Sequence, residues 1–256
     1  MMLWAVAFSG GLFVGMLVMQ HLGHLIAMRR IAADPETAKK GAGVIEGAVF
    51  GLLSLMVAFT FSGSVTRFDA RRHLVNEETV RISTAWERLH LLPAGAQPGL
   101  RDLFRRYVDA RLETYSNPAD VVATAAAWKH SQELHEEIWA HAVEASQASP
   151  TTVAAMLLLP AVNQMIDITY TRLMATRMHP PPIVYAMLAV LALIGALLAG
   201  YHMAGGKARS WLHTIGFAAV ISATTYVILD IEYPRLGLIR VDAADEALRD
   251  LRDRMN

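Results

Sequence analysis

A run of twenty residues without a charged side chain, Gly47–Thr66, constrains this chain more than any other feature. Twenty apolar residues in helical conformation span the hydrocarbon core of a bilayer, so the run predicts a transmembrane helix. Charged residues begin abruptly at Arg67, and no helix breaker lies between Gly63 and Pro93. We therefore expect this helix to continue out of the membrane.

Three further uncharged stretches predict three more membrane helices, giving spans near residues 3–27, 44–66, 183–203 and 211–230. The hydrophobic fraction of 54% and the charged fraction of 18% agree with a membrane protein. The prolines of His179-Pro180-Pro181-Pro182 prevent a continuous helix into the third span. Residues 1–66 and 182–232 are thus predicted as paired transmembrane segments, two helices in each.

Between the second and third spans, residues 67–181 read as a soluble helical domain, because charges recur every few residues while apolar side chains repeat at helical spacing. Residues 233–256 form a short amphipathic C-terminal tail. No stretch alternates apolar and polar residues long enough for a strand. The fold class predicted is all-α, a four-span helical membrane protein.

Small residues follow one ridge of the second span. Gly43, Gly47 and Gly51 recur at intervals of four, and Ser54, Ala58 and Ser62 continue the ridge. Small side chains let two helix backbones approach closely in lipid, so we expect Gly47 and Gly51 to lie at a helix–helix contact. A second face carries Phe50, Val57, Phe61 and Ser64, and its spacing is compatible with lipid, with a bundle interior or with a pore.

Catalytic motifs are not found. The sequence has no phosphate-binding loop, dinucleotide fingerprint or His-Glu-x-x-His motif, and it contains no cysteine, so neither an enzyme nor a cofactor is indicated. The pair His21 and His24 and the set His130, Glu137 and His141 share helix faces, which is compatible with metal binding or with ordinary polar surfaces. Asp167 stands among apolar residues, and we expect it to pair with Arg172 or Arg71.

Charge distribution limits the partners and leaves orientation undecided. The formal net charge is zero, which disfavours a nucleic-acid partner. Four spans place both termini and the helical domain on one side of the membrane. Six Lys and Arg residues on the two short loops favour cytoplasmic short loops, whereas several Arg residues lie near the membrane on the domain side.

Four stretches of the sequence are distinctive together. They are AFTFSGSVTRFDARRHLVNEE in the second span and its continuation, HPPP at 179–182, the segment 211–242 and the segment 92–112. These stretches resemble the bacterial bestrophin-like membrane proteins. The helix layout and the aromatic–Asp pair Phe68-Asp69 also resemble true bestrophins. The resemblance implies a homo-oligomer, a pentamer in that family, that conducts monatomic ions across the inner cell membrane with its helical domain in the cytoplasm.

The resemblance also implies roles for residues of the second span, which lines a shared pore in bestrophins. The implied hydrophobic neck is formed by Phe50, Val57 and Phe61. The implied polar pore residues are Glu46, Ser54, Ser62 and Ser64, and the implied electrostatic collar is Arg67, Asp69, Arg71 and Arg72. The calcium-binding acidic cluster of animal bestrophins has no counterpart here, so calcium gating is not implied.

Two functions are therefore carried forward. One is an oligomeric ion channel, in which the Arg collar would favour anions and a ring of Glu46 would favour cations. The other is a membrane-anchored scaffold or sensor whose helical domain binds a partner.

Overall fold

The computed structural model describes residues 2–33, 42–116, 120–205, 211–233, 238–239 and 242–255. These residues form helices and short connections, and no strand occurs among them, as the sequence predicts. The α-helices are α1 (Met2–Ala33), α2 (Ala42–Arg88), α3 (Gln97–Ser116), α4 (Val121–Gln147), α5 (Val153–Arg177), α6 (Pro182–His202), α7 (Trp211–Glu232) and α8 (Asp242–Arg254). Two short 3-10 segments, η2 (Leu89–Leu91) and η3 (Met203–Gly205), follow α2 and α6.

Four helices are long and apolar enough to cross a membrane, and they coincide with the four predicted spans. The second span and the segment after it form one continuous helix of 47 residues, α2, as expected from the absence of a breaker. α5 also continues through Pro160, where the sequence allows a kink or an end. Six Lys and Arg residues on the two short loops bear on the orientation in the membrane. Four of them lie in 34–41 and 206–210, outside the described residues.

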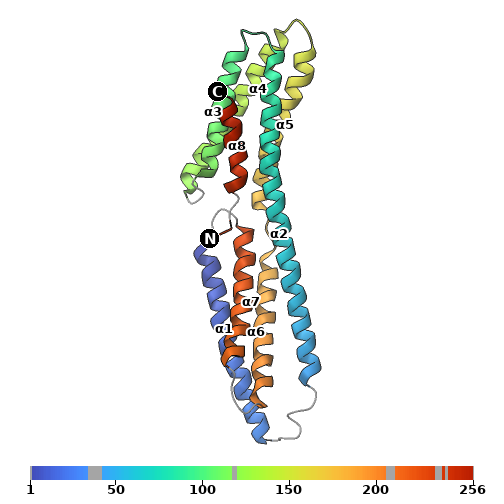
Figure 1. Ribbon diagram of the computed structural model, residues 1–256, viewed down its shortest axis with the longest axis vertical. Coiled ribbons are helices and arrows are strands. Elements are labelled where there is room, and N and C mark those ends of the chain that lie inside the picture. The colour runs from blue at the N-terminus through green and yellow to red at the C-terminus, as the bar shows by residue number, and fades with distance from the viewer. Residues whose placement is uncertain are drawn as a thin grey trace. The chain divides into compact units, whose positions relative to one another are not determined.

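The chain divides into two compact units. Unit 1 comprises Met1–Thr66 and His179–Tyr233, and unit 2 comprises Arg67–Met178 and Pro234–Asn256. Unit 1 contains α1, α6, α7 and the first part of α2 (Figure 1). Unit 2 contains the rest of α2 with α3, α4, α5 and α8, so the amphipathic tail belongs to the same unit as the helical domain.

Close packing of α1 against α6 holds unit 1 together. A Cβ atom placed on Gly200 would lie 2.0 Å from the backbone oxygen of Gln20, and one on Gly23 would lie 2.0 Å from the oxygen of Leu197. Only glycine allows two backbones to come this close. The side chain of Gln20 is buried and donates to the backbone oxygen of Thr214 at 3.2 Å, which ties α1 to α7 as well.

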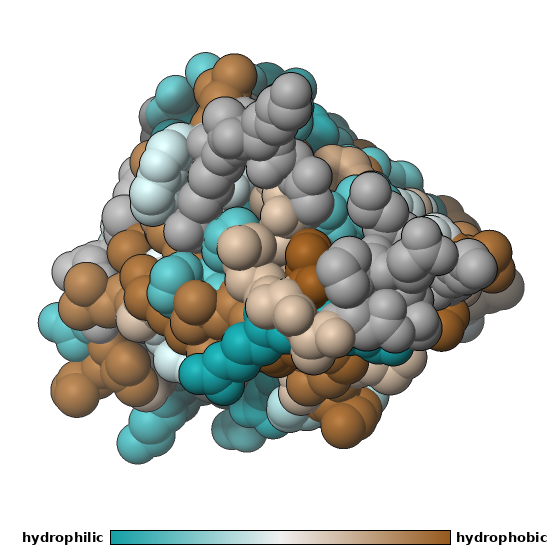
Figure 2. All heavy atoms as spheres, turned by 90° about the horizontal axis from the view of Figure 1, so that it is seen from below, coloured by the Kyte–Doolittle hydropathy of each residue, from teal (hydrophilic) through white to brown (hydrophobic). Residues whose placement is uncertain are grey.

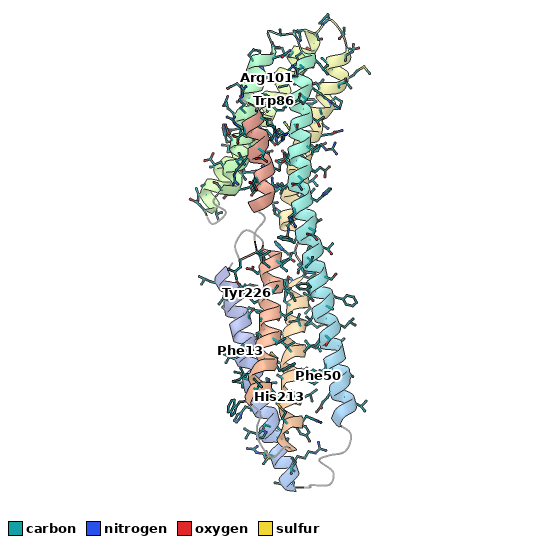
Figure 3. The ribbon with its side chains drawn as sticks, viewed as in Figure 1. Phe13, Phe50, Trp86, Arg101, His213 and Tyr226 are labelled. Carbon is teal, nitrogen blue, oxygen red and sulfur yellow. The ribbon has the colours of Figure 1, made fainter. Side chains whose placement is uncertain are left out.

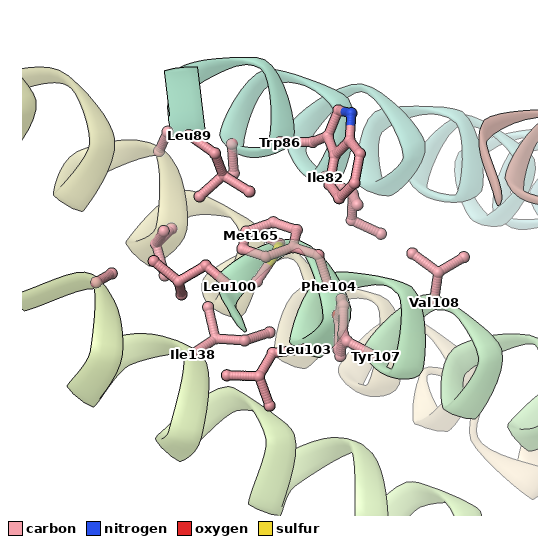
Figure 4. Packing of buried hydrophobic residues seen from close by; sticks show 14 of the residues in the cluster. Ile82, Trp86, Leu89, Leu100, Leu103, Phe104, Tyr107, Val108, Ile138 and Met165 are labelled. Carbon is pink, nitrogen blue, oxygen red and sulfur yellow. The ribbon is translucent and has the colours of Figure 1, made fainter. Parts of the chain in front are cut away.

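Unit 2 has the larger apolar core. Phe104 and Tyr107 of α3 pack with Ile82 of α2, Ile138 of α4 and Met165 of α5, all fully buried (Figure 4). The tail joins this core through three side chains of one face, Leu248, Leu251 and Met255. Two polar contacts reinforce it, because Arg252 forms an ion pair with Asp109 and Arg105 donates to the backbone oxygen of Met255 at 2.7 Å.

Candidate pore-lining helix and buried charge sites

The first part of α2 has an inner face that packs within the chain. Its buried members are Glu46, Leu53, Thr60 and Ser64, spaced by seven, seven and four residues. That spacing follows one side of a helix. Leu53 belongs to an apolar cluster with Leu12 and Met16 of α1 and Ala192, Ala196 and Ala218 of α6 and α7. The inner face therefore supplies the packing that positions α2 in unit 1.

Two of the three expected neck residues lie on or beside this inner face. Phe50 is half-buried, and its ring meets that of Phe217 edge-on with centroids 5.7 Å apart. It also lies next to Gly195, where an added Cβ would be 3.4 Å from the Phe50 ring. Val57 packs against both apolar clusters of unit 1. Phe61, at the flank, is 40% exposed. Phe50 and Val57 are thus engaged inside the single chain.

The outer face of α2, defined by Ala48, Leu55, Phe59, Ser62 and Thr66, is exposed in the single chain. Leu55 is 50% exposed and Phe59 is 67% exposed. These positions follow one another at helical spacing and lie opposite Leu53 and Thr60 on the helix. Leu55 and Phe59 were not singled out from the sequence. Their interval of four residues, next to the small-residue ridge, could have indicated that they share one exposed face.

The small-residue ridge is exposed as well. All six of its members are exposed, and a Cβ added to Gly43, Gly47 or Gly51 would meet nothing within 4 Å. The expected helix–helix contact at Gly47 and Gly51 is therefore not made by the described part of this chain. A flank of small side chains with no neighbour is available for a second polypeptide.

The expected polar pore residues divide between the two faces. Ser54 and Ser62 are exposed, whereas Ser64 is fully buried. Glu46 is 7% exposed, and its Oε2 lies 3.2 Å from Nδ1 of His202 at the end of α6. The other carboxylate oxygen, Oε1, is buried without a hydrogen bond. Glu46 is thus directed into unit 1.

The expected electrostatic collar lies in unit 2 and is not uniformly exposed. Arg71 is 8% exposed and donates to the backbone oxygens of Ala175 and Met178, at 3.1 and 2.9 Å. It therefore satisfies carbonyl groups that the end of α5 leaves without a helical partner. Asp69 and Arg72 are exposed and form a loose ion pair at 3.7 Å, and Arg67 is half-buried.

A buried network of charges joins four helices of unit 2. Glu78 of α2 is fully buried, accepts from Arg111 of α3 at 2.6 Å and also pairs with Arg172 of α5. Arg172 in turn donates to Asp245 of α8 at 3.1 Å. Two carboxylates and two guanidinium groups balance, which burial of charge requires. Burial alone would lower the pKa of Arg111, but the adjacent Glu78 carboxylate raises it overall.

Asp167 was expected to pair with Arg172 or Arg71, and this expectation is wrong. Asp167 accepts a hydrogen bond from Asn163 of the same helix at 3.1 Å and is exposed to solvent. The two arginines are engaged elsewhere, because Glu78 and Asp245 offer Arg172 buried carboxylates. Glu78, which does pair with Arg172, lies 94 positions away in the sequence. The apolar residues around Asp167 gave no indication of that pairing.

Histidines give no metal centre among the described residues, where no group of three His, Cys, Asp or Glu side chains is placed to hold an ion. His130 lies near Glu133 and His141 near Glu144, at 3.7 and 3.9 Å on the exposed face of α4. His135 differs, because it is 3% exposed and both ring nitrogens are unpaired. Burial, with a smaller contribution from the charge of Arg111, lowers its pKa to about 4.

Comparisons with known proteins identify the fold and the family of this chain. A solved bacterial bestrophin homologue from Klebsiella pneumoniae, in a point-mutant form, superimposes with a TM-score of 0.65 at 16% identity. The match covers 95% of this chain and 99% of the homologue, and at this identity it shows a shared fold. No curated protein matches the sequence. The family model described as a bestrophin-like domain matches residues 5–245. The chain belongs to the bestrophin-like family.

Proposed function

We propose that this protein is an oligomeric membrane ion channel whose pore is lined by the outer face of α2. The single observation that carries the proposal is the exposure of Leu55 and Phe59 on a helix whose opposite face is packed. Exposed apolar side chains alone suit lipid equally well. The adjoining ridge of small residues favours a protein neighbour, because close backbone approach is how helices associate without a hydrophobic driving force.

Copies of the chain would meet along the small-residue ridge. Gly47 and Gly51 have open space around them in one chain, and a neighbouring helix would fill it. A ring of copies then directs Leu55 and Phe59 toward a common axis, since both lie on the side of α2 away from Leu53. Closed rings are the usual outcome of repeated identical contacts, and a pentamer is the number expected from the family resemblance.

Leu55 and Phe59 would form the hydrophobic neck, and Phe61, two residues after Phe59, lies on another side of the helix. An apolar constriction resists ion passage by excluding water, so it can gate conduction without a moving plug. This assignment moves the neck from Phe50 and Val57, whose intrachain packing supports a structural role. Ser62 would follow Phe59 along the pore as a polar group.

Salt flux into liposomes and currents across planar bilayers test this proposal. Phe59→Ala should widen the neck and raise flux several-fold over the unsubstituted protein. Phe50→Ala is the matched control, because it removes the same ring from the inner face and should not increase conduction. Equal flux for the two variants, or no flux from correctly assembled protein, would exclude the outer face of α2 as the pore wall and favour the scaffold function.

Assembly is tested separately. Gly51→Leu should block subunit contact and reduce the particle to a smaller species in size-exclusion chromatography. Gly10→Leu is its control, because Gly10 is also exposed on a membrane helix with nothing within 4 Å of an added Cβ. If both variants keep the native particle size, the small-residue ridge is not the contact between copies.

A further inference from the structure

One end of unit 1 carries a buried carboxylate that is only half satisfied. Glu46 lies one helical turn before Phe50 on the inner face of α2 and is 7% exposed. Its Oε2 meets Nδ1 of His202 at 3.2 Å, and its Oε1 is buried without a hydrogen bond. Within the described residues, His202 is its only ion-pair partner. An ionised carboxylate removed from water at such a place depends heavily on its one counter-charge.

His202 is well suited to supply a conditional charge. It is the last residue of α6, and its side chain is 69% exposed, so protons reach it freely from solvent. Histidine is the side chain whose ordinary titration lies between pH 5 and 8. When the imidazole is protonated, the pair is ionic. When the imidazole is neutral, it donates at most one hydrogen bond, and Glu46 then has no ion-pair partner among the residues that the structure describes.

Other polar groups at this level of unit 1 come from α1 and α7. Gly200 of α6 packs against Gln20 of α1. The later α1 residues His21, His24 and Arg30 therefore lie toward this end of unit 1. So does His213, which precedes Thr214 on α7 (Figure 3). Arg30 donates to the hydroxyl of Tyr201 at 3.4 Å and stays charged at every relevant pH. Its positive charge therefore acts on this end of unit 1 without changing with pH. Of the three other histidines, His213 on α7 serves as the control position.

We propose that Glu46 and His202 together form a proton-binding site that holds the first turn of α2 against α6. Loss of one proton from the site weakens the hold, because the buried carboxylate then gains more from hydration than from the neutral imidazole. The next attachment along α2 is the packing of Phe50 against Gly195 and Phe217, so only the first turn is released. Apolar residues reach the surface at several places around this end of unit 1 (Figure 2).

The absence of cysteine from the chain allows a direct test. Spin labels at Val44→Cys, an 84% exposed position on the first turn of α2, and Ile194→Cys on α6 report the distance between the two helices. The labelled protein is diluted with unlabelled protein so that pairs arise within one chain. Between pH 5 and pH 9, we expect a narrow short distance to give way to a longer, broader distribution in a one-proton transition.

Three variants assign the transition. His202→Lys, permanently charged, should keep the narrow distance at both pH values, and His202→Gln should show the broad one at both. His213→Gln is the matched control and should titrate like the parent protein. His202 is exposed, so neither change endangers folding.

A parent protein without a transition overturns the proposal, as does a transition that persists in His202→Gln. A transition lost in His213→Gln overturns it too, because the titrating group would then lie on α7. The measurement does not depend on conduction, so a result here stands apart from the channel hypothesis.

Discussion

Substitution of Gly200 by alanine should separate α1 from α6. The new Cβ would lie 2.0 Å from the backbone oxygen of Gln20 and 2.6 Å from its carbonyl carbon, whereas real Cβ contacts under 3.0 Å essentially do not occur. Backbone atoms cannot rotate aside as a side chain can. The two helices must therefore move apart by about 1 Å, the difference between 3.0 and 2.0 Å.

A gap of that width is expensive. A radial gap of roughly 0.5–1 Å already forfeits a quarter to a half of the dispersion energy of each contact across it. Overpacking of this kind costs about 1–3 kcal/mol in known cases, and the clash with backbone puts Gly200→Ala at the upper end. The hydrogen bond from Gln20 to Thr214 would weaken as α1 shifts, and Gln20 would lose its one described donor contact.

Unfolding in mixed micelles by added SDS measures the effect. Gly216→Ala is the control, because it lies on membrane helix α7 with nothing within 4 Å of an added Cβ. That variant should be neutral or more stable, since alanine favours the helix by up to about 1 kcal/mol. We expect Gly200→Ala to unfold at clearly lower SDS than Gly216→Ala. If the two variants unfold together, α1 and α6 do not touch at Gly200.

Three predictions concern unit 2. Glu78→Gln leaves two buried guanidinium groups without their shared carboxylate and should lower the free energy of unfolding by about 3–5 kcal/mol. The neighbouring Glu77→Gln removes a partly exposed ion pair with Arg81 and should lower it by under about 1 kcal/mol. Chemical denaturation of the two variants measures the difference. Leu248→Ala should cost about 2–5 kcal/mol by emptying a fully buried site, and thermal melts show it. Burial lowers the pKa of His135 from 6.5 to about 4, so its neutral form stabilises the fold above pH 6.5 and this contribution is lost as pH falls toward 4. His135→Phe should therefore flatten the dependence of melting temperature on pH between 6.5 and 4. An unchanged slope would show that His135 is not the group responsible.

The membrane helices could be predicted from sequence because their signal is local. An uncharged run such as Gly47–Thr66 needs no partner to be recognised, and its length alone matches a bilayer. The continuity of α2 was equally local, since only a proline or a cluster of turn residues would have ended it.

The orientation of α2 could not be predicted in the same way. Apolar residues surround this helix on all sides, so periodicity does not distinguish the face that packs from the face that is exposed. Phe50 and Phe59 look alike in the sequence, and only the position of Phe217 and Gly195 separates them. The two partners of Glu78 could not be predicted either, because Arg111 and Arg172 lie 33 and 94 positions away in the sequence.

The contact of α1 with α6 and α7 also bears on how the protein is made. Gln20 and the residue whose oxygen it binds, Thr214, are separated by 194 positions. At a synthesis rate of about 5–20 residues per second, α1 waits roughly 10–40 s for this partner to emerge. During that interval the amide of Gln20 and the bare backbone at Gly23 have no final neighbour. We therefore expect nascent α1 to depend on the membrane-insertion machinery until α6 and α7 emerge, and variants that weaken its late docking should be degraded before they fold.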